Sequence, residues 1–141
     1  MVSQVGSGRA LSLFVAALFL PGCRGEKPPP PQEVVVWHQV GTWSGRANTQ
    51  TETFTSDTGG FRVRWATTNE TVPGGGTLKV IIRSADSGRE IVEAVDAHGV
   101  DSDAAIVAAE RPRWYYLSID SANVDWTVSV DERIEAHRVS K

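Results

Sequence analysis

The 141-residue chain contains a single cysteine, Cys23. One thiol cannot form an intrachain disulfide, so the folded part must be held together by its core. The three histidines, His38, His98 and His137, are isolated from one another in the sequence. Because zinc sites need several closely spaced Cys or His ligands, this sequence gives no support to one.

The sequence also lacks a hydrophobic run long enough to cross a bilayer. Residues 10–20 form an apolar run of eleven residues, which as a helix would rise about 16 Å, roughly half of the hydrocarbon core. This run follows a short leader whose only charge is Arg9, a pattern typical of a secretory signal. A buried amphipathic helix is disfavoured, because the run has no polar face and is followed by Pro21 and Gly22.

Clustered positive charge and catalytic motifs are missing as well. The chain has 14 basic and 17 acidic residues, a net charge of −3, scattered along its length. Nucleic-acid binding needs a clustered basic face, so it is not expected. Residues 74–76 are a glycine loop without a phosphate-loop lysine, and residues 43–45 form a turn, not a nucleophile elbow. Spacing singles out no acid–base pair, and no cofactor is expected.

The junction at Leu20-Pro21-Gly22-Cys23 resembles the lipobox of bacterial lipoproteins. The resemblance covers residues 18–23. It implies a signal peptide over residues 1–22, cleavage between Gly22 and Cys23, and attachment of a diacylglycerol, with further acylation such as palmitate, at Cys23. Several buried acyl chains anchor a protein firmly, at about 0.8 kcal/mol per CH₂ group. Ordinary secretion is the alternative, and the choice of inner or outer membrane stays open.

Residues 23–33 form the expected linker, because they include four consecutive prolines, residues 28–31. Such a tract adopts the polyproline II conformation at about 3.1 Å per residue and acts as a semi-rigid spacer. A role as a proline-rich ligand is the weaker alternative. Beyond the linker we expect a folded domain over residues 34–131 and a charged C-terminal tail over residues 132–141.

The domain shows strand and turn signals at regular spacing, without a long helical period. An all-β antiparallel sandwich of about eight strands is therefore predicted. Its rhythm, with Trp65 and residues 114–117, resembles small jelly-roll or CUB-like sandwiches, a likeness that implies no functional residue. Propensity alone would allow a helix over residues 103–110, but the strand is favoured. The expected strands are 34–40, 49–55, 61–65, 77–83, 89–95, 103–110, 113–119 and 124–130.

Alternation along the strands predicts which side chains face outward. Trp65 and Trp126 alternate with polar residues on apolar faces and are expected in the core. Alternate residues of 115–119 form another apolar face, which turns Trp114 and Tyr116 outward. If Arg62 and Arg64 lie on a neighbouring strand, the four residues form an aromatic and cationic recognition surface.

Asp96, Asp101 and Asp103 are a weak candidate for a calcium site, because Ca²⁺ takes carboxylate oxygens from short loops. The favoured interpretation is that these residues bond their own backbone in turns.

Together, these features predict a lipid-anchored, extracytoplasmic β-sandwich that acts as a binding or structural module of the cell envelope, without enzymatic activity. Its partner is expected to be an envelope protein or a glycan. A carbohydrate-binding module is the main alternative, and a hydrolase with carboxylates assembled in space is a weaker one.

Overall fold

A computed structural model describes residues 22, 25–31, 33–108 and 113–137. The chain divides into two units, Met1–Pro30 and Pro31–Lys141. The described residues of the first unit contain no helix or strand. Within the described part of the chain, no helix has the length and hydropathy needed to cross a bilayer.

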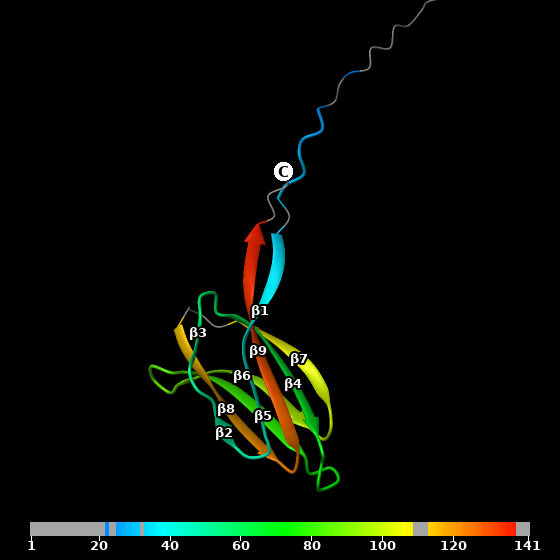
Figure 1. Cartoon of the computed structure of the whole chain (residues 1–141), viewed down its shortest axis with the longest axis vertical. Coiled ribbons are helices and arrows are strands. Elements are labelled where there is room, and N and C mark those ends of the chain that lie inside the picture. Colours follow the sequence, from blue (N-terminus) through cyan, green and yellow to red (C-terminus); the bar gives the residue numbers. More distant parts are fainter. Residues whose placement is uncertain (1–21, 23–24, 32, 109–112, 138–141) are drawn as a thin grey trace, which may run out of the picture. The chain divides into compact units, whose positions relative to one another are not determined.

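The second unit consists of strands joined by turns and loops (Figure 1). They are β1 (Glu33–Gly45), β2 (Thr49–Gln50), β3 (Phe54–Ser56), β4 (Gly60–Thr68), β5 (Thr77–Ser84), β6 (Glu90–His98), β7 (Ser102–Ala108), β8 (Arg113–Ala122) and β9 (Asp125–His137).

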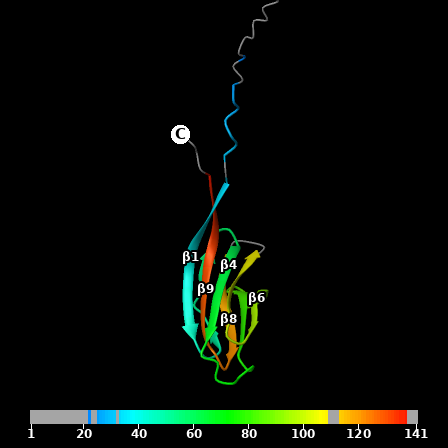
Figure 2. The ribbon, with the colours of Figure 1, turned by 90° about the vertical axis from the view of Figure 1, so that its right-hand side faces the viewer.

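These strands form two antiparallel sheets packed face to face, so the predicted β-sandwich is confirmed. The first sheet has the order β1-β9-β4-β7. The second has the order β2-β8-β5-β6, and β3 also pairs with β8. Figure 2 shows the two layers from the side.

The pairing follows one simple rule. The first strand pairs with the last, β2 and β3 with β8, β4 with β7, and β5 with β6, all antiparallel. The chain is thus one long antiparallel hairpin, centred on the β5–β6 turn and rolled up so that successive pairs alternate between the sheets. This is the arrangement of a jelly roll.

The core lies between the two sheets and follows the predicted alternation. In β4, Phe61 and Val63 are fully buried, whereas Arg64 between Val63 and Trp65 is exposed. Trp126 is buried and Trp65 packs partly buried against the core, as predicted. The other large, fully buried side chains are Leu78, Val80, Ile82, Tyr115, Leu117, Ile119, Val124, Val128 and Val130.

Several strand boundaries differ from the sequence prediction. The stretch predicted as one strand over residues 49–55 is split into β2 and β3, and β1 continues beyond residue 40 to Gly45. In β1 the register shifts between Gln39 and Gly41, which marks a β-bulge that lets the strand run on. The ambiguous segment is a strand, β7, as favoured, and its residues 109–110 lie outside the described part.

The largest difference concerns the expected tail. Residues 132–137 are not a tail but the last part of β9, so the domain does not end at residue 131. They pair with β1 from Glu33↔His137 to His38↔Glu132. β4 begins at Gly60 and pairs with β9 only as far as Glu132, so beyond this residue β1 and β9 leave the sandwich as a two-stranded ribbon (Figures 1 and 2). The charged composition of this segment suits a solvated ribbon as well as a tail.

Candidate functional site

The structure separates the two halves of the predicted aromatic and cationic surface. Arg62 and Arg64 lie on the outer face of the first sheet, in β4. Trp114 and Tyr116 lie on the outer face of the second sheet, in β8, where Trp114 is 54% exposed. Each side chain points outward as predicted, but β4 and β8 are not neighbours. The predicted four-residue surface therefore does not form.

The two arginines meet a different aromatic residue and an acid instead. Arg62 pairs in register with Asp131 of β9, and Arg64 is the next outward residue along β4. On the other side of β9, Trp37 of β1 is opposite Arg133. We call this set of five residues, Trp37, Arg62, Arg64, Asp131 and Arg133, the arginine surface.

Asp131 is the centre of the arginine surface. Arg62 Nε and Nη2 lie 2.9 and 2.8 Å from Asp131 Oδ2. Arg64 Nε lies 2.8 Å from Oδ2 and its Nη2 lies 3.1 Å from Oδ1. The carboxylate is only 3% exposed, whereas the side chains of Arg62 and Arg64 are 31% and 47% exposed. One buried anion is thus held under two accessible cations.

This geometry keeps Asp131 ionised. Burial by itself raises the pKa of Asp131, but hydrogen bonds and the charges of Arg64 and Arg62 outweigh it, so the pKa lies below its ordinary value. The hydrogen bond to Asp131 raises the pKa of Arg64 in turn. Asp131 and Arg64 therefore stay charged over the ordinary pH range.

Trp37 fixes the orientation of Arg62. The guanidinium carbon of Arg62 lies 4.7 Å from the centre of the Trp37 ring, a cation–π arrangement. The half-buried Trp37 is carried by β1, whose register with β9 places it diagonally across from Arg62. Sequence analysis did not single out Trp37, because its neighbour in space is 25 positions away in the chain.

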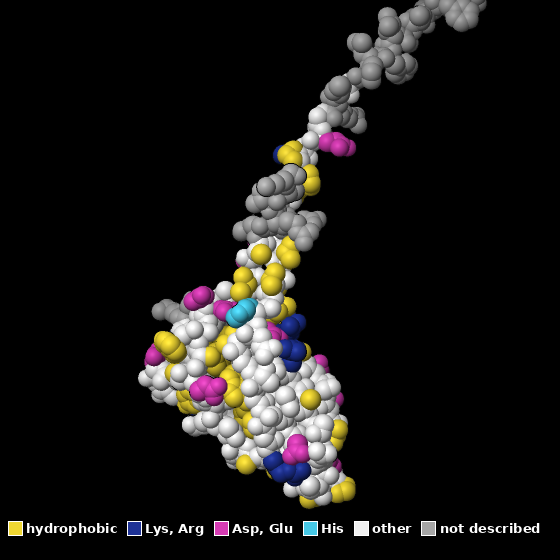
Figure 3. Space-filling view, viewed as in Figure 1, with side chains coloured by type: hydrophobic (Ala, Val, Ile, Leu, Met, Phe, Trp, Pro, Cys, Tyr) yellow, Lys and Arg dark blue, Asp and Glu magenta, His cyan; other side chains and the backbone are white. Residues whose placement is uncertain are grey.

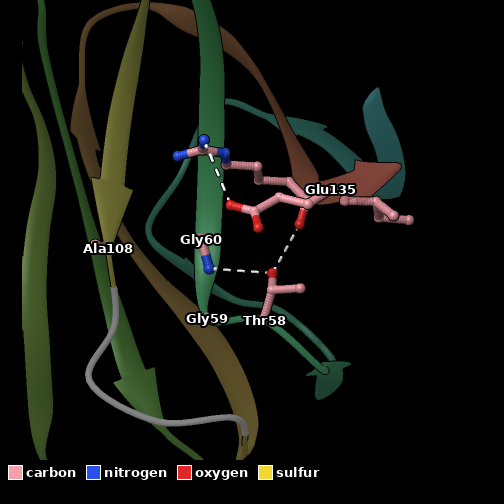
Figure 4. A pocket seen from close by; sticks show the side chains of 7 residues that line it. Thr58, Gly59, Gly60, Ala108 and Glu135 are labelled. Atoms are coloured by element: carbon pink, nitrogen blue, oxygen red, sulfur yellow. Dashed lines mark hydrogen bonds and ion pairs between the residues drawn. The ribbon is translucent and has the colours of Figure 1, made fainter. Parts of the chain in front are cut away.

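A pocket adjoins Arg133 at the base of the ribbon, with a volume of about 480 Å³. It forms where β4 begins at Gly60 and β7 ends at Ala108, while β9 continues past them. Figure 4 shows Ala108 and Thr58 on opposite sides of this pocket, with Gly60 between them. Arg133 Nη2 lies 3.5 Å from Glu135 Oε1, and both side chains are about half exposed. The pocket therefore combines small residues with an accessible ion pair.

The arginine surface differs in charge from the rest of the domain. Residues 33–137 contain nine basic and sixteen acidic residues, a net charge of −7. The arginine surface has three guanidinium groups against Asp131 and the nearby Glu135, a local excess of one positive charge. Figure 3 shows basic side chains beneath the ribbon on the face in view. A positive site on an acidic domain can attract an anion that the remaining surface repels.

Glu132, which the sequence analysis assigned to the C-terminal tail, is a buried residue of β9 and supports the same region from inside the sandwich. Its Oε1 accepts hydrogen bonds from Ser56 Oγ at 2.6 Å and from the backbone N–H groups of Asp57 and Thr58 at 2.7 and 3.0 Å. Burial raises the pKa of Glu132, but these hydrogen bonds outweigh it and leave the pKa below its ordinary value. Glu132 thereby ties the turn before β4 to β9.

The three aspartates of the calcium hypothesis do not converge. Asp96 is on β6, in the second sheet, whereas Asp103 is on β7, in the first. The carboxylates of Asp101 and Asp103 accept hydrogen bonds from the N–H groups of the residues that follow them, at 2.8 and 2.7 Å. Across residues 33–108 and 113–137, no group of three or more His, Cys, Asp or Glu side chains is placed to hold a metal ion.

The predicted cleavage and lipidation site consists of Gly22 and Cys23. Gly22 is exposed and outside any helix or strand, and Cys23 lies outside the described residues. Comparison of the chain with protein-family models, curated proteins and solved structures gave no match.

The alternation along the last strand indicates on which face Asp131 and Arg133 lie. Val124, Trp126, Val128 and Val130 set an alternation along the last strand. Continuing that alternation beyond residue 130 turns Asp131 outward, to the same side as the outward arginines of β4. What the pattern could not supply is the pairing of β9 with both β1 and β4.

Proposed function

We propose that this protein is a lipid-anchored binding module of the cell envelope, without enzymatic activity, and that its arginine surface contacts the partner. The anchor is Cys23, reached through the linker over residues 23–33. The membrane is one partner, and an envelope protein or glycan is the other. No nucleic acid takes part.

One observation carries the assignment of the binding surface. Arg62 and Arg64 form hydrogen bonds to one buried carboxylate, yet both remain accessible to solvent. Arginine forks of this kind recognise carboxylate and phosphate groups with defined geometry. The leader, the lipobox-like junction and the proline tract support export and anchoring.

A carbohydrate-binding module that uses the opposite sheet is the second candidate. Trp114 is 54% exposed on the outer face of the second sheet. Large exposed aromatic rings with a polar edge are suited to recognition surfaces. Trp114→Ala therefore distinguishes the two faces.

The test has two parts. In cells, we expect a palmitate analogue to label the wild-type protein and not Cys23→Ser; an unlabelled wild type would contradict the anchor. In vitro, the protein lacking residues 1–22 and carrying Cys23→Ser is sedimented with isolated envelope fragments. We expect Arg64→Gln to reduce the bound fraction several-fold and Trp114→Ala to leave it unchanged.

Arg46→Gln is the matched control for this sedimentation. Arg46 is 46% exposed, close to the 47% of Arg64, and lies 2.7 Å from Asp125. If Arg46→Gln reduces binding as much as Arg64→Gln, binding reflects overall charge and not the arginine surface. If only Trp114→Ala reduces binding, the second sheet is the binding face.

A further inference from the structure

We infer that the arginine surface binds the carboxylate or phosphate group of an acidic envelope glycan. This inference rests on the proposed function and names the chemical class of its ligand. It is carried by the hydrogen-bond donors, the fixed geometry and the adjoining pocket of the arginine surface.

The first support is a surplus of donors. Each guanidinium group carries five N–H donors and no acceptor. Asp131 engages Nε and Nη2 of Arg62 and of Arg64. In the described part of the chain, the Nη1 groups of both arginines have no hydrogen-bond partner. Two accessible cations share one buried carboxylate, so one positive charge and several N–H donors are left for an oxyanion.

The second support is preorganisation. Trp37 lies against Arg62 at 4.7 Å, and Asp131 holds both guanidinium groups through the short contacts above. Long arginine side chains ordinarily lose much rotamer entropy on binding. Here that ordering has already occurred on folding, so an oxyanion would be bound at a smaller entropic cost.

The third support is the pocket beside Arg133. Its volume of about 480 Å³ is within the range of small-molecule sites. The walls are mixed, with the small residues Gly59, Gly60 and Ala108, the aliphatic Ile134 and the polar Thr58. The Arg133–Glu135 pair is exposed and 3.5 Å apart, so it is weak and Arg133 can exchange it for a ligand.

A glycan fits these features better than an acidic protein does. Arginine and tryptophan are common at protein–protein interfaces as well, so the feature that favours a sugar is the pocket beside the arginines, which can enclose a small ring. The charged cluster and this pocket adjoin at Arg133, so one ligand can contact both. An acidic sugar can place its ring in the pocket and its oxyanion on the arginines.

The experiment measures intrinsic tryptophan fluorescence of the protein lacking residues 1–22 and carrying Cys23→Ser. The probes are trigalacturonate, galactose 6-phosphate, neutral galactotriose and a glutamate-rich peptide. We expect trigalacturonate or galactose 6-phosphate to bind, the better of the two identifying carboxylate or phosphate as the group recognised. Galactotriose should bind at least tenfold more weakly, and added salt should weaken binding.

Variants locate the site. We expect Arg64→Gln to lower the affinity for the acidic sugar about tenfold, because a charge-assisted hydrogen bond is lost. Arg62→Lys, which keeps the charge but not the fork, should also weaken binding, and Arg46→Gln should not. Far-UV circular dichroism confirms that each variant is folded.

Three results would overturn the inference: galactotriose binding as well as trigalacturonate, the peptide binding more tightly than both acidic sugars, or Arg46→Gln weakening binding as much as Arg64→Gln. If no acidic sugar binds while sedimentation with envelope fragments still depends on Arg64, the ligand class is wrong and the proposed function stands. If that sedimentation is also independent of Arg64, the arginine surface is not the binding site.

Discussion

Glu132 shows how one buried carboxylate organises the end of the sandwich. Its Oε1 accepts hydrogen bonds from the turn that leads into β4, and the residue is 8% exposed. Hydrogen bonds to a charged group contribute about 1.5–3 kcal/mol each, roughly twice as much as bonds to a neutral acceptor such as an amide oxygen. A neutral residue of the same shape at this position should therefore be costly.

Replacing Glu132 should change both stability and its pH dependence. We expect Glu132→Gln to lower the free energy of unfolding by about 2 kcal/mol at neutral pH. The pKa of Glu132 is depressed in the folded state. Its contribution is therefore present above the unfolded pKa of about 4.3 and is lost as the pH falls through the lower folded pKa.

Urea unfolding between neutral pH and pH 3 measures this effect. The difference between wild type and Glu132→Gln should shrink towards low pH, and the exposed Glu52→Gln provides the control. A difference that stays constant with pH would show that the carboxylate charge of Glu132 is not what stabilises the turn.

At the scale of elements, the ribbon of β1 and β9 is the feature that the composition of the sequence did not predict. Three of the six residues from Glu132 to His137 are charged, and this composition predicted a tail. In the structure they pair with the Val-rich beginning of β1. A two-stranded ribbon is only marginally stable alone in water, so this one depends on the sandwich from which it extends.

Truncation of β9 tests the boundary of the domain. A chain ending at Asp131, the predicted boundary, loses Glu132 and the register partners of Glu33 to His38. We expect its melting temperature to fall by about 10 °C or more, since 1 kcal/mol corresponds to roughly 4–8 °C in a domain of this size. A chain ending at His137 should melt like the full-length protein. If the two truncated chains have the same melting temperature, residues 132–137 behave as a tail that does not stabilise the domain.

At the scale of the whole molecule, the pairing rule has a kinetic consequence. The β5–β6 hairpin is local in sequence, whereas the pair β1–β9 joins the two ends of the domain. Sheets dominated by non-local pairs fold slowly, in about milliseconds to seconds. We expect folding to begin at the β5–β6 hairpin, because this pair closes the shortest loop.

Two glycines with nearly the same positive φ, one in the β5–β6 hairpin and one in another loop, allow the order of folding to be tested. Gly88, in the β5–β6 turn, has φ = 71°, and Gly74, between β4 and β5, has φ = 73°. A Cβ on either would have no close contact, so Gly→Ala at each costs mainly the left-handed strain of about 1–2 kcal/mol.

Stopped-flow kinetics distinguish the two positions. Gly88→Ala should mainly slow folding, and Gly74→Ala should mainly speed unfolding. If both substitutions affect the two rates equally, the hairpin is not formed early and the nucleus lies elsewhere.

Local patterns in the sequence were sufficient for the all-β class, the core tryptophans and the outward direction of Arg62 and Arg64. Alternation of apolar and polar residues determines which face of a strand is buried, because successive side chains point to opposite faces. The strand over β7 was likewise favoured correctly. The lipobox-like junction at Cys23 is also a local pattern and remains a prediction.

Only the tertiary structure decided which strands are neighbours. The alternation of apolar and polar residues does not indicate which strands pair with each other. It therefore could not predict that β4 and β8 belong to different sheets, or that Trp37 and Asp131 contact Arg62. The same limit hid the role of residues 132–137, whose strand exists because β1 pairs with it. The arginine surface is therefore a product of the jelly-roll pairing, which joins the first strand to the last.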